Sequence, residues 1–497
     1  MRRINYLAMS LLASAALAFT GCSSEDVING GTEKNEGNEY FMTMTIQTSS
    51  SQGKVGTRTV ENNPIYGNTN ESDVTSGTFI VTDANKNIVY SKVINRDEWQ
   101  NSVVKWEEGQ DGKTQLVIPV QYVSPNVTYN VYFLANTTNT TPWTATYTAA
   151  TEFVGTYADA KKFVMFNQND GDISADNYQV TFTEANKEQT NAATITAADG
   201  KNTTIKIERV VARIDQPTST ATEIKAYEPK AGETLSDAKK TAMADAIAKV
   251  KSVSLTGYAL ANLANKTNIM QQWNATSGLL MPEGTTFQHP TEGFGTSTKM
   301  DNVNWFKDIV TSSQSNPAVN YVFENNATAA PQNATTMYFE YTVKLKDNEG
   351  ADCNDGTFYR FENKIYTSIA AIYAAFGTNT LPFGQTSDKT LAELKIVDGK
   401  ITASQEELST FRTNHKIEVF VGGKTYYKQT IRDLYYNGGT DYLVQRNSIY
   451  QLKVNNVYNV GADVPNGDPD DVNPYYYLDV DVTVNPWVLN ERNVDLQ

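Results

Sequence analysis

The sequence is poor in the residues that build catalytic and metal sites. Its 497 residues include only two His and two Cys. His289 and His415 stand in unrelated contexts, and neither has a second His or Cys at the spacing of a zinc site. There is no nucleophile elbow and no phosphate-binding loop ending in Gly-Lys-Ser/Thr. We therefore expect no enzyme activity, no metal and no cofactor, and we interpret each His as a surface or strand residue.

Basic side chains are in the minority. The chain has 41 Lys and Arg against 56 Asp and Glu, which gives a net charge of -15. An acidic surface repels phosphate, so nucleic acid is not an expected partner. Two acidic segments, 167–176 and 463–471, lack the spacing of an EF-hand loop. We interpret them as solvated hairpin loops, with calcium-stabilised turns as the alternative.

Long apolar runs are absent after residue 21, so no transmembrane helix is expected. Before that point, Arg2 and Arg3 precede an apolar stretch, 6–19, that is too short to span a bilayer and is typical of a signal peptide. The stretch ends in FTGC, residues 19–22, which has the small residues of a lipobox. We predict lipidation at Cys22 and a precursor anchored in the outer membrane. The alternative is an ordinary cleaved signal with an incidental Cys.

A lipidated Cys22 leaves Cys353 as the only other thiol, so no disulfide can form within one chain. Export would permit disulfides. Stability must therefore come from apolar burial and strand pairing.

The residues that are plentiful favour β-structure. Hydrophobic residues make up 40% of the chain, which has 28 Tyr, and Thr, Val, Tyr and Asn recur in short alternating runs bounded by turn residues. These runs predict strands at 40–48, 77–82, 86–93, 114–119, 128–135, 178–183, 203–214, 338–345, 416–420, 425–431, 449–454 and 478–485. We expect a mainly β fold with two β-sandwich domains of a transthyretin-like or Greek-key type, together with a few short helices.

Helical patterns are scarce. The clearest is 235–250, with Ser236 as its candidate N-cap, and a shorter apolar one covers 365–376. A polar link at 216–233 separates two series of strands. The predicted organisation is a signal peptide (1–21), a propeptide with a lipid tether and the first strand (22–58), an N-terminal domain (59–217), a C-terminal domain (218–486) and a tail (487–497).

The first strand and the tail differ in pattern. The strand places four apolar residues on one face at period two, namely Tyr40, Met42, Met44 and Ile46. The tail has two short alternations that are out of phase, formed by Trp487, Leu489, Val494 and Leu496. By composition the tail is either disordered or a strand without a partner in its own chain.

Several features, taken in their order along the chain, resemble those of the fimbrillins. These are the type V pilins that build major and minor fimbriae on some bacteria that have an outer membrane. The similarity is greatest to the main shaft subunit of the minor-fimbrium branch. The features are the lipobox at Cys22, the Met-rich strand 40–48, Arg58 soon after it, IKIERVVARID at 205–215, TFYRFENKIYTS at 357–368, VQRNSIYQLKVNNVYNVG at 444–461 (which includes Arg446, Asn447 and Tyr450) and the strand ending Asn485-Pro486-Trp487.

The resemblance implies a route of assembly. An arginine-specific protease cuts the lipidated precursor in its first loop, which here means after Arg58, so that Thr59 becomes the N-terminus. Lys54 is a weaker alternative. The strand with Tyr40, Met42, Met44 and Ile46 leaves with the lipid. The tail of another copy, with Trp487, Leu489, Val494 and Leu496, then fills the open groove.

The implied partners are other copies of the chain in a filament, tip and anchor fimbrillins, the protease, and the outer membrane through the lipid. The mature protein would lie in an extracellular fimbrium that supports adhesion. Two alternatives stay open: a tip or accessory fimbrillin, and a surface lipoprotein that binds glycan without polymerising. In the second, Tyr435-Tyr436 and Tyr475 to Tyr477 would stack on sugars.

Overall fold

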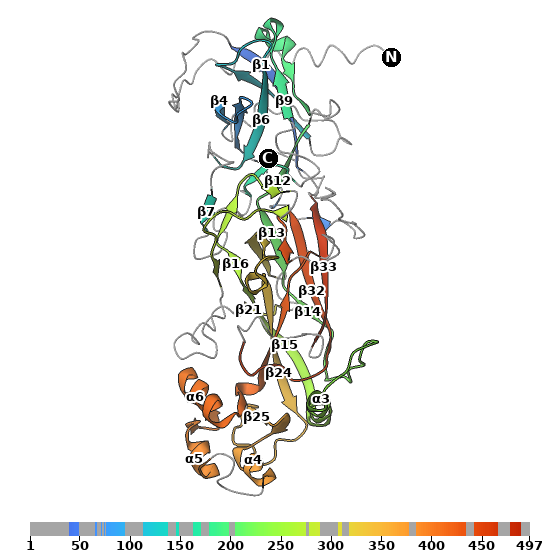
Figure 1. Cartoon of the computed structure of the whole chain (residues 1–497), viewed down its shortest axis with the longest axis vertical. Coiled ribbons are helices and arrows are strands. Elements are labelled where there is room, and N and C mark those ends of the chain that lie inside the picture. The colour runs from blue at the N-terminus through green and yellow to red at the C-terminus, as the bar shows by residue number, and fades with distance from the viewer. Residues whose placement is uncertain are drawn as a thin grey trace.

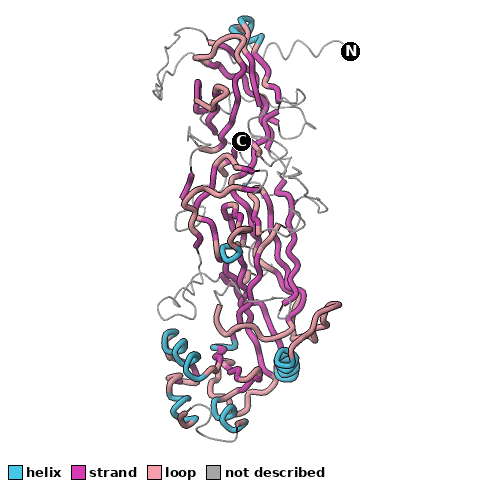
Figure 2. The backbone as a smooth tube through the Cα atoms, viewed as in Figure 1, coloured by secondary structure: helices cyan, strands magenta, loops and turns pink. Residues whose placement is uncertain are grey.

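The computed structural model describes residues 39–48, 65–66, 71, 74, 76–94, 113–137, 146–148, 163–169, 178–197, 204–274, 278–288, 307–310, 318–376, 384–433, 442–465 and 478–488. Strands dominate, as predicted, and follow the long axis of the molecule, while most of the α-helical residues gather at one end (Figures 1 and 2).

The N-terminal part of the chain forms one large sheet around its own core. The strands are β1 (Tyr40–Thr48), β3 (Gly77–Thr82), β4 (Ile88–Ile94), β5 (Lys113–Val120), β6 (Thr128–Ala135), β8 (Met165–Asn167), β9 (Tyr178–Thr181), β10 (Ala193–Thr194), β11 (Thr196–Ala197) and β12 (Thr204–Arg209). The main order is β10-β1-β12-β8-β6-β3-β4, with β5 on β1, β9 on β6 and β11 on β9. The buried faces of these strands meet in the first core.

The C-terminal part is a sandwich of two sheets. One has the order β2-β33-β32-β13-β22 and uses β2 (Ile65–Tyr66), β33 (Leu478–Val488), β32 (Ser448–Val457), β13 (Val211–Asp215) and β22 (Val319–Phe323), with β14 (Thr218–Ser219) on β32. The other has the order β21-β15-β24-β30 and uses β21 (Lys307–Asp308), β15 (Val250–Ala261), β24 (Thr336–Leu345) and β30 (Lys424–Thr430). Both sheets contribute side chains to the second core, and the Tyr341 hydroxyl bonds Ser219 Oγ across them at 2.7 Å.

A third core lies at the end of the sandwich. It is formed by β25 (Phe358–Phe361), β26 (Lys364–Tyr366), β29 (Glu418–Phe420), α4 (Ile369–Ala375), α5 (Ser387–Ala392), α6 (Gln405–His415) and the hairpin β27 (Ile396–Val397) and β28 (Lys400–Ile401). Short strands complete the described structure: β7 (Thr146–Thr148), β16 (Leu263–Ala264), β17 (Lys266–Asn268), β18 (Trp273–Asn274), β19 (Gly278–Leu279), β20 (Phe287–Gln288), β23 (Asn325–Asn326) and β31 (Leu443–Val444).

The helix predictions meet mixed outcomes. Helix α3 (Asp237–Lys249) forms where expected, and the Ser236 side chain caps it by accepting from the Lys239 backbone N–H. The helix predicted at 365–376 begins only at Ile369, because 364–366 form β26. The strand predicted at 416–420 is wrong at its start, since α6 runs to His415 and Lys416 closes it in a left-handed conformation with φ of 58°.

The strand predicted at 203–214 is in fact two strands. β12 ends at Arg209 and β13 begins at Val211, and the two belong to different sheets. The first core includes Val211, whereas the second begins with Ala212. One stretch of chain therefore passes directly from the N-terminal sheet into the C-terminal sandwich, without a loop.

A buried ion pair holds the two parts together close to this crossing. Arg446 Nη2 lies 2.6 Å from Glu324 Oε1, and the two side chains are 1% and 0% exposed. Arg446 also donates to the carbonyl of Ile269 at 2.7 Å, and Gln271 Nε2 donates to Glu324 at 2.8 Å. Ile269 and Met270 pack in the first core. Arg446 thus ties a segment inserted in the N-terminal core to the C-terminal sandwich.

Replacing one partner of this pair should be costly. Arg446→Ala leaves the Glu324 carboxylate buried without its cation, so we expect a loss of about 3–5 kcal/mol in the free energy of unfolding. Urea denaturation followed by tryptophan fluorescence measures it. Lys240→Ala, which removes an exposed ion pair with Asp237, should change stability by less than about 0.5 kcal/mol. Equal losses in the two variants would show that Arg446 is not a structural tie.

Candidate functional site

Strand β1 fills a slot between strands that otherwise have few partners. Along one edge it pairs antiparallel with β5, from Tyr40↔Val120 to Gln47↔Lys113. Along the other edge it pairs parallel with β10 at Met42 and Thr43, and with β12 from Thr45 to Thr48. Among the strands that the structure describes, β1 is the only partner of β5 and of β10. The sheet would be open along both edges of the slot without β1.

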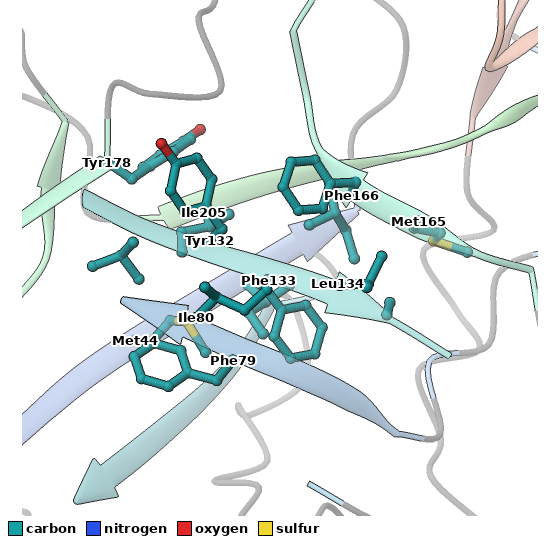
Figure 3. Packing of buried hydrophobic residues seen from close by; sticks show 14 of the residues in the cluster. Met44, Phe79, Ile80, Tyr132, Phe133, Leu134, Met165, Phe166, Tyr178 and Ile205 are labelled. Carbon is teal, nitrogen blue, oxygen red and sulfur yellow. The ribbon is translucent and has the colours of Figure 1, made fainter. Parts of the chain in front are cut away.

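The inward face of β1 consists of the four apolar residues singled out from the sequence. Tyr40, Met42 and Met44 are fully buried and Ile46 is 3% exposed. Figure 3 shows Met44 beside Phe79 and Ile80 of β3, within the first core. Burying four such side chains contributes on the order of 6–12 kcal/mol at ~1.5–3 kcal/mol each, an upper estimate because unfolded chains already bury some surface. This amount is comparable to the whole stability of a typical domain.

The C-terminal strand lies on the neighbouring sandwich. β33 pairs antiparallel with β32, from Val457↔Leu478 to Ser448↔Pro486. Leu478 belongs to the second core, and Val480 and Val482 pack against it. At its end β33 pairs in parallel with β2, Ile65 with Trp487 and Tyr66 with Val488. Trp487 thus continues the strand, while Leu489, Val494 and Leu496 lie outside the described residues, as do Cys22, Lys54, Arg58 and Thr59.

The slot and the C-terminal strand are connected by one run of backbone. β12 forms the wall of the slot beside residues 45–48 and continues through Val210 into β13. β13 pairs in parallel with β32 at Arg213↔Ile449 and Ile214↔Tyr450, and β32 carries β33. A pull on a strand in the slot therefore reaches the C-terminal strand through hydrogen-bonded neighbours and without a flexible linker.

A cluster of charged residues lies where this run crosses between the sheets. Glu71 is 1% exposed. Arg213 Nη1 lies 3.1 Å from its carboxylate, and the Tyr321 hydroxyl donates to it at 2.5 Å. Arg209 donates to the Glu71 carbonyl at 2.7 Å and to Asn447 Oδ1 at 2.8 Å. Burial lowers the pKa of Arg209 to about 9, and the charge of Glu71 opposes that shift.

This cluster explains part of the segment 444–461 that the sequence singled out. Asn447 has φ of 54°, and its backbone N–H donates to Val211 O at 2.8 Å. Its side-chain Oδ1 accepts a hydrogen bond from Arg209. The Tyr450 hydroxyl accepts from the Gln445 backbone N–H at 2.7 Å. Glu71, Arg209 and Glu324 were not expected from the sequence. Arg209 lies in a strand pattern, where a charge usually indicates an exposed position, and Glu71 and Glu324 lie outside the predicted strands.

Two of the residues considered for chemistry are described, and both are buried. His415 is not a surface or strand residue, because it is buried at the end of α6, with Nε2 2.8 Å from Glu393. Cys353 is a buried free thiol, and burial raises its pKa to about 11. His289 and most of both acidic segments lie outside the described residues. Within those residues no group of three or more His, Cys, Asp or Glu could hold a metal, and no helix is long and apolar enough to cross a membrane.

Comparison with known families identifies the C-terminal part. Residues 418–493 match the model of the fimbrillin C-terminal segment of the major fimbrial subunit proteins of type IV. The match begins at β29 and includes β30, β31, β32 and β33. No curated protein matches the chain.

Several solved structures are similar over most of the chain. A candidate cell adhesion protein of Parabacteroides distasonis ATCC 8503 has 13% identity and a TM-score of 0.43, covering 90% of this chain and 97% of its own. Another, of Bacteroides eggerthii DSM 20697, has 10% identity and a TM-score of 0.44, covering 92% and 98%. A fimbrial assembly protein of P. distasonis has 12% identity and a TM-score of 0.26, covering 62% and 99%.

The buried thiol gives a direct check on the C-terminal fold. In a chain that begins at Ser23, Cys353 is the only thiol. A pKa raised to about 11 leaves on the order of one thiolate in a thousand at pH 8, whereas an unfolded Cys with its usual pKa of about 8.5 is about a quarter ionised. Ellman's reagent should thus react at least 100-fold more slowly with the native protein than in 6 M guanidinium. Equal rates would place Cys353 at the surface.

Proposed function

We propose that this chain, a member of the fimbrillin family through residues 418–493, is a structural subunit of a surface fimbrium and not an enzyme. The subunit is exported as a lipoprotein, cut after Arg58 and polymerised by exchange of a β-strand. The observation that carries the proposal is the position of β1, a segment that precedes Arg58 in the chain. β1 buries four side chains in the slot and pairs with the strands on both of its edges.

Cleavage after Arg58 would change how β1 is held. Before the cut, β1 is covalently joined to the rest of the domain. After the cut, only hydrogen bonds and burial retain it, and the lipid at Cys22 stays with the released piece. Departure of β1 would uncover unpaired N–H and C=O groups on β5 and β12 together with apolar pockets, and such edges template strand addition.

The occupant that we propose is the tail of a second copy. The tail begins within the last two residues of β33, where Trp487 pairs with Ile65 of its own chain, so a tail bound elsewhere would give up that pairing and stay anchored through the rest of β33. Its apolar residues Trp487, Leu489, Val494 and Leu496 are the proposed donor side chains. A contact between the tail of one copy and the slot of the next is heterologous and does not close on itself, so it generates a filament.

The location follows from the same steps. The precursor is held in the outer membrane through the lipid on Cys22, and the processed subunit lies outside the cell in the fimbrium. Its partners there are further copies, with tip and anchor fimbrillins at the two ends of the filament. The shaft role fits a chain in which β1 can be displaced and the tail 487–497 can be donated. The fimbrium would support adhesion.

Processing is tested at one residue. In the native host, the sheared surface protein should begin at Thr59 and run as a heat-sensitive ladder of multimers on an unboiled gel. Arg58→Ala should abolish both, because β1 then remains covalently attached in the slot. The matched control, Lys54→Ala in the same segment, should behave like the wild type. A ladder formed by chains that still begin at Cys22 would contradict the proposal.

The donor is tested separately. A chain that ends at Val488 keeps the described part of β33 but lacks Leu489, Val494 and Leu496. We expect it to be processed to Thr59 and to remain monomeric, because its slot can open but it offers no strand. Tryptophan fluorescence and a normal melting temperature verify that the shortened chain is folded. Polymers formed by this chain at the wild-type rate would exclude the tail as donor.

A further inference from the structure

The two halves of the slot have walls of different stability. Beside residues 45–48 the wall is β12, which also pairs with β8 through Ile207↔Asn167 and its neighbours, so it has a second partner besides β1. Beside Met42 and Thr43 the wall is β10, whose only partner among the described strands is β1. Loss of β1 would therefore leave the first wall in place and free the second.

The segment that carries β10 folds back over the start of β1. It consists of the 3-10 turns η4 (Glu184–Lys187) and η5 (Gln189–Asn191) followed by β10. Its base is fixed on one side by β9 and on the other by β11, which pair at Gln179↔Thr196. Most residues from 183 to 192 are exposed, so the segment has little core of its own.

Tyr40 anchors the turns of this segment, while its end is held by the pairing of β10 and by Ala193 and Ile195 in the first core. Its hydroxyl donates to Glu184 Oε1 at 3.3 Å, and Lys187 Nζ lies 5.5 Å from the centre of its ring. Lys187 is in turn paired with Glu184 at 2.6 Å. On the inner side the Tyr40 ring lies 5.5 Å from that of Phe182. A cation over an aromatic face, a hydroxyl contact and ring packing thus converge on one side chain of β1.

The turns are held together by their own hydrogen bonds. The Thr183 N–H donates to Asn186 Oδ1 at 2.5 Å, and Asn186 Nδ2 donates to the carbonyl of Asn191 at 2.6 Å. These bonds lie within the segment and do not involve β1. The shape of 183–191 can therefore persist while its attachment to β1 is lost.

We propose that residues 183–195 form a clasp, closed over the first half of the slot by Tyr40, which controls release of β1 and opens the slot when β1 leaves. This inference rests on the proposed strand exchange and deepens it. Cleavage alone then does not empty the slot, because the contacts of Tyr40 with Glu184 and Lys187 must also break. Once β1 has left, β10 has lost its strand partner and the open clasp exposes one end of the slot to a strand from a second copy.

Hydrogen exchange on the intact chain from Ser23 tests the clasp. In Tyr40→Ala, amides in 184–195 should exchange at least 10-fold faster than in the wild type, while those of 204–209 stay unchanged. The matched variant Ile46→Ala, also buried on β1 but paired next to β12, should leave 184–195 unchanged. Unchanged protection of 184–195 in Tyr40→Ala would overturn the proposal.

Release of β1 is measured after a cut made in vitro. A site for a sequence-specific protease replaces residues 56–59, and departure of the N-terminal fragment is followed by size exclusion in urea just below the unfolding midpoint. Lys187→Ala and Glu184→Ala leave β1 intact, and we expect the fragment to leave three- to tenfold faster. Lys240→Ala on α3 is the control. Release at the wild-type rate in both clasp variants would overturn the clasp.

These results are independent of processing in the cell. If the clasp variants behave as expected but sheared protein does not begin at Thr59, the clasp stands and the assembly route fails. If the protein begins at Thr59 and the clasp variants release β1 at the wild-type rate, strand exchange stands without a clasp.

Discussion

The first sheet depends on the hydrogen bonding of one strand that comes from the start of the chain. β5 and β10 have no other strand partner within the described structure, and β1 pairs along one of the two edges of β12. Four side chains of β1 also fill the centre of the first core. A sheet that is completed by a terminal strand can be completed equally by another strand of similar pattern, because backbone groups do not distinguish which chain supplies them.

The junction between the two parts has the opposite character. Arg446 and Glu324 form a buried ion pair, and the Glu71 carboxylate pairs with Arg213 while Arg209 donates to the Glu71 carbonyl and to Asn447. Buried ion pairs contribute little net stability compared with apolar residues, but removal of one partner is severe. Loss of either partner of such a pair would therefore destabilise the contact between the two parts. The strand β1 pairs with β12, and β12 continues into β13 at this junction.

Prediction from the sequence succeeded where a local period decides the structure. The alternation from Tyr40 to Ile46 identifies a strand and its buried face, and Ser236 marks the start of α3. It failed where distant partners decide. IKIERVVARID reads as one strand because both of its halves are buried, and only the change of neighbours from β8 to β22 and β32 breaks it at Val210. Likewise, Arg446 and Glu324 are 122 positions apart, and no local pattern joins them.

The proposed strand exchange places two opposite requirements on the sequence of β1. In the proposed strand exchange, β1 completes the fold of the subunit and later leaves it, so its four apolar residues have to fill the first core while one wall beside them can release. Beside Met42 the wall is β10, which has no second partner among the described strands, whereas beside Ile46 the wall is β12, which also pairs with β8 farther along. The rigid half of the slot is the half that continues into the C-terminal sandwich. In the proposed filament, an incoming strand would be held where the wall continues into the C-terminal sandwich, and it would enter where the sheet can open.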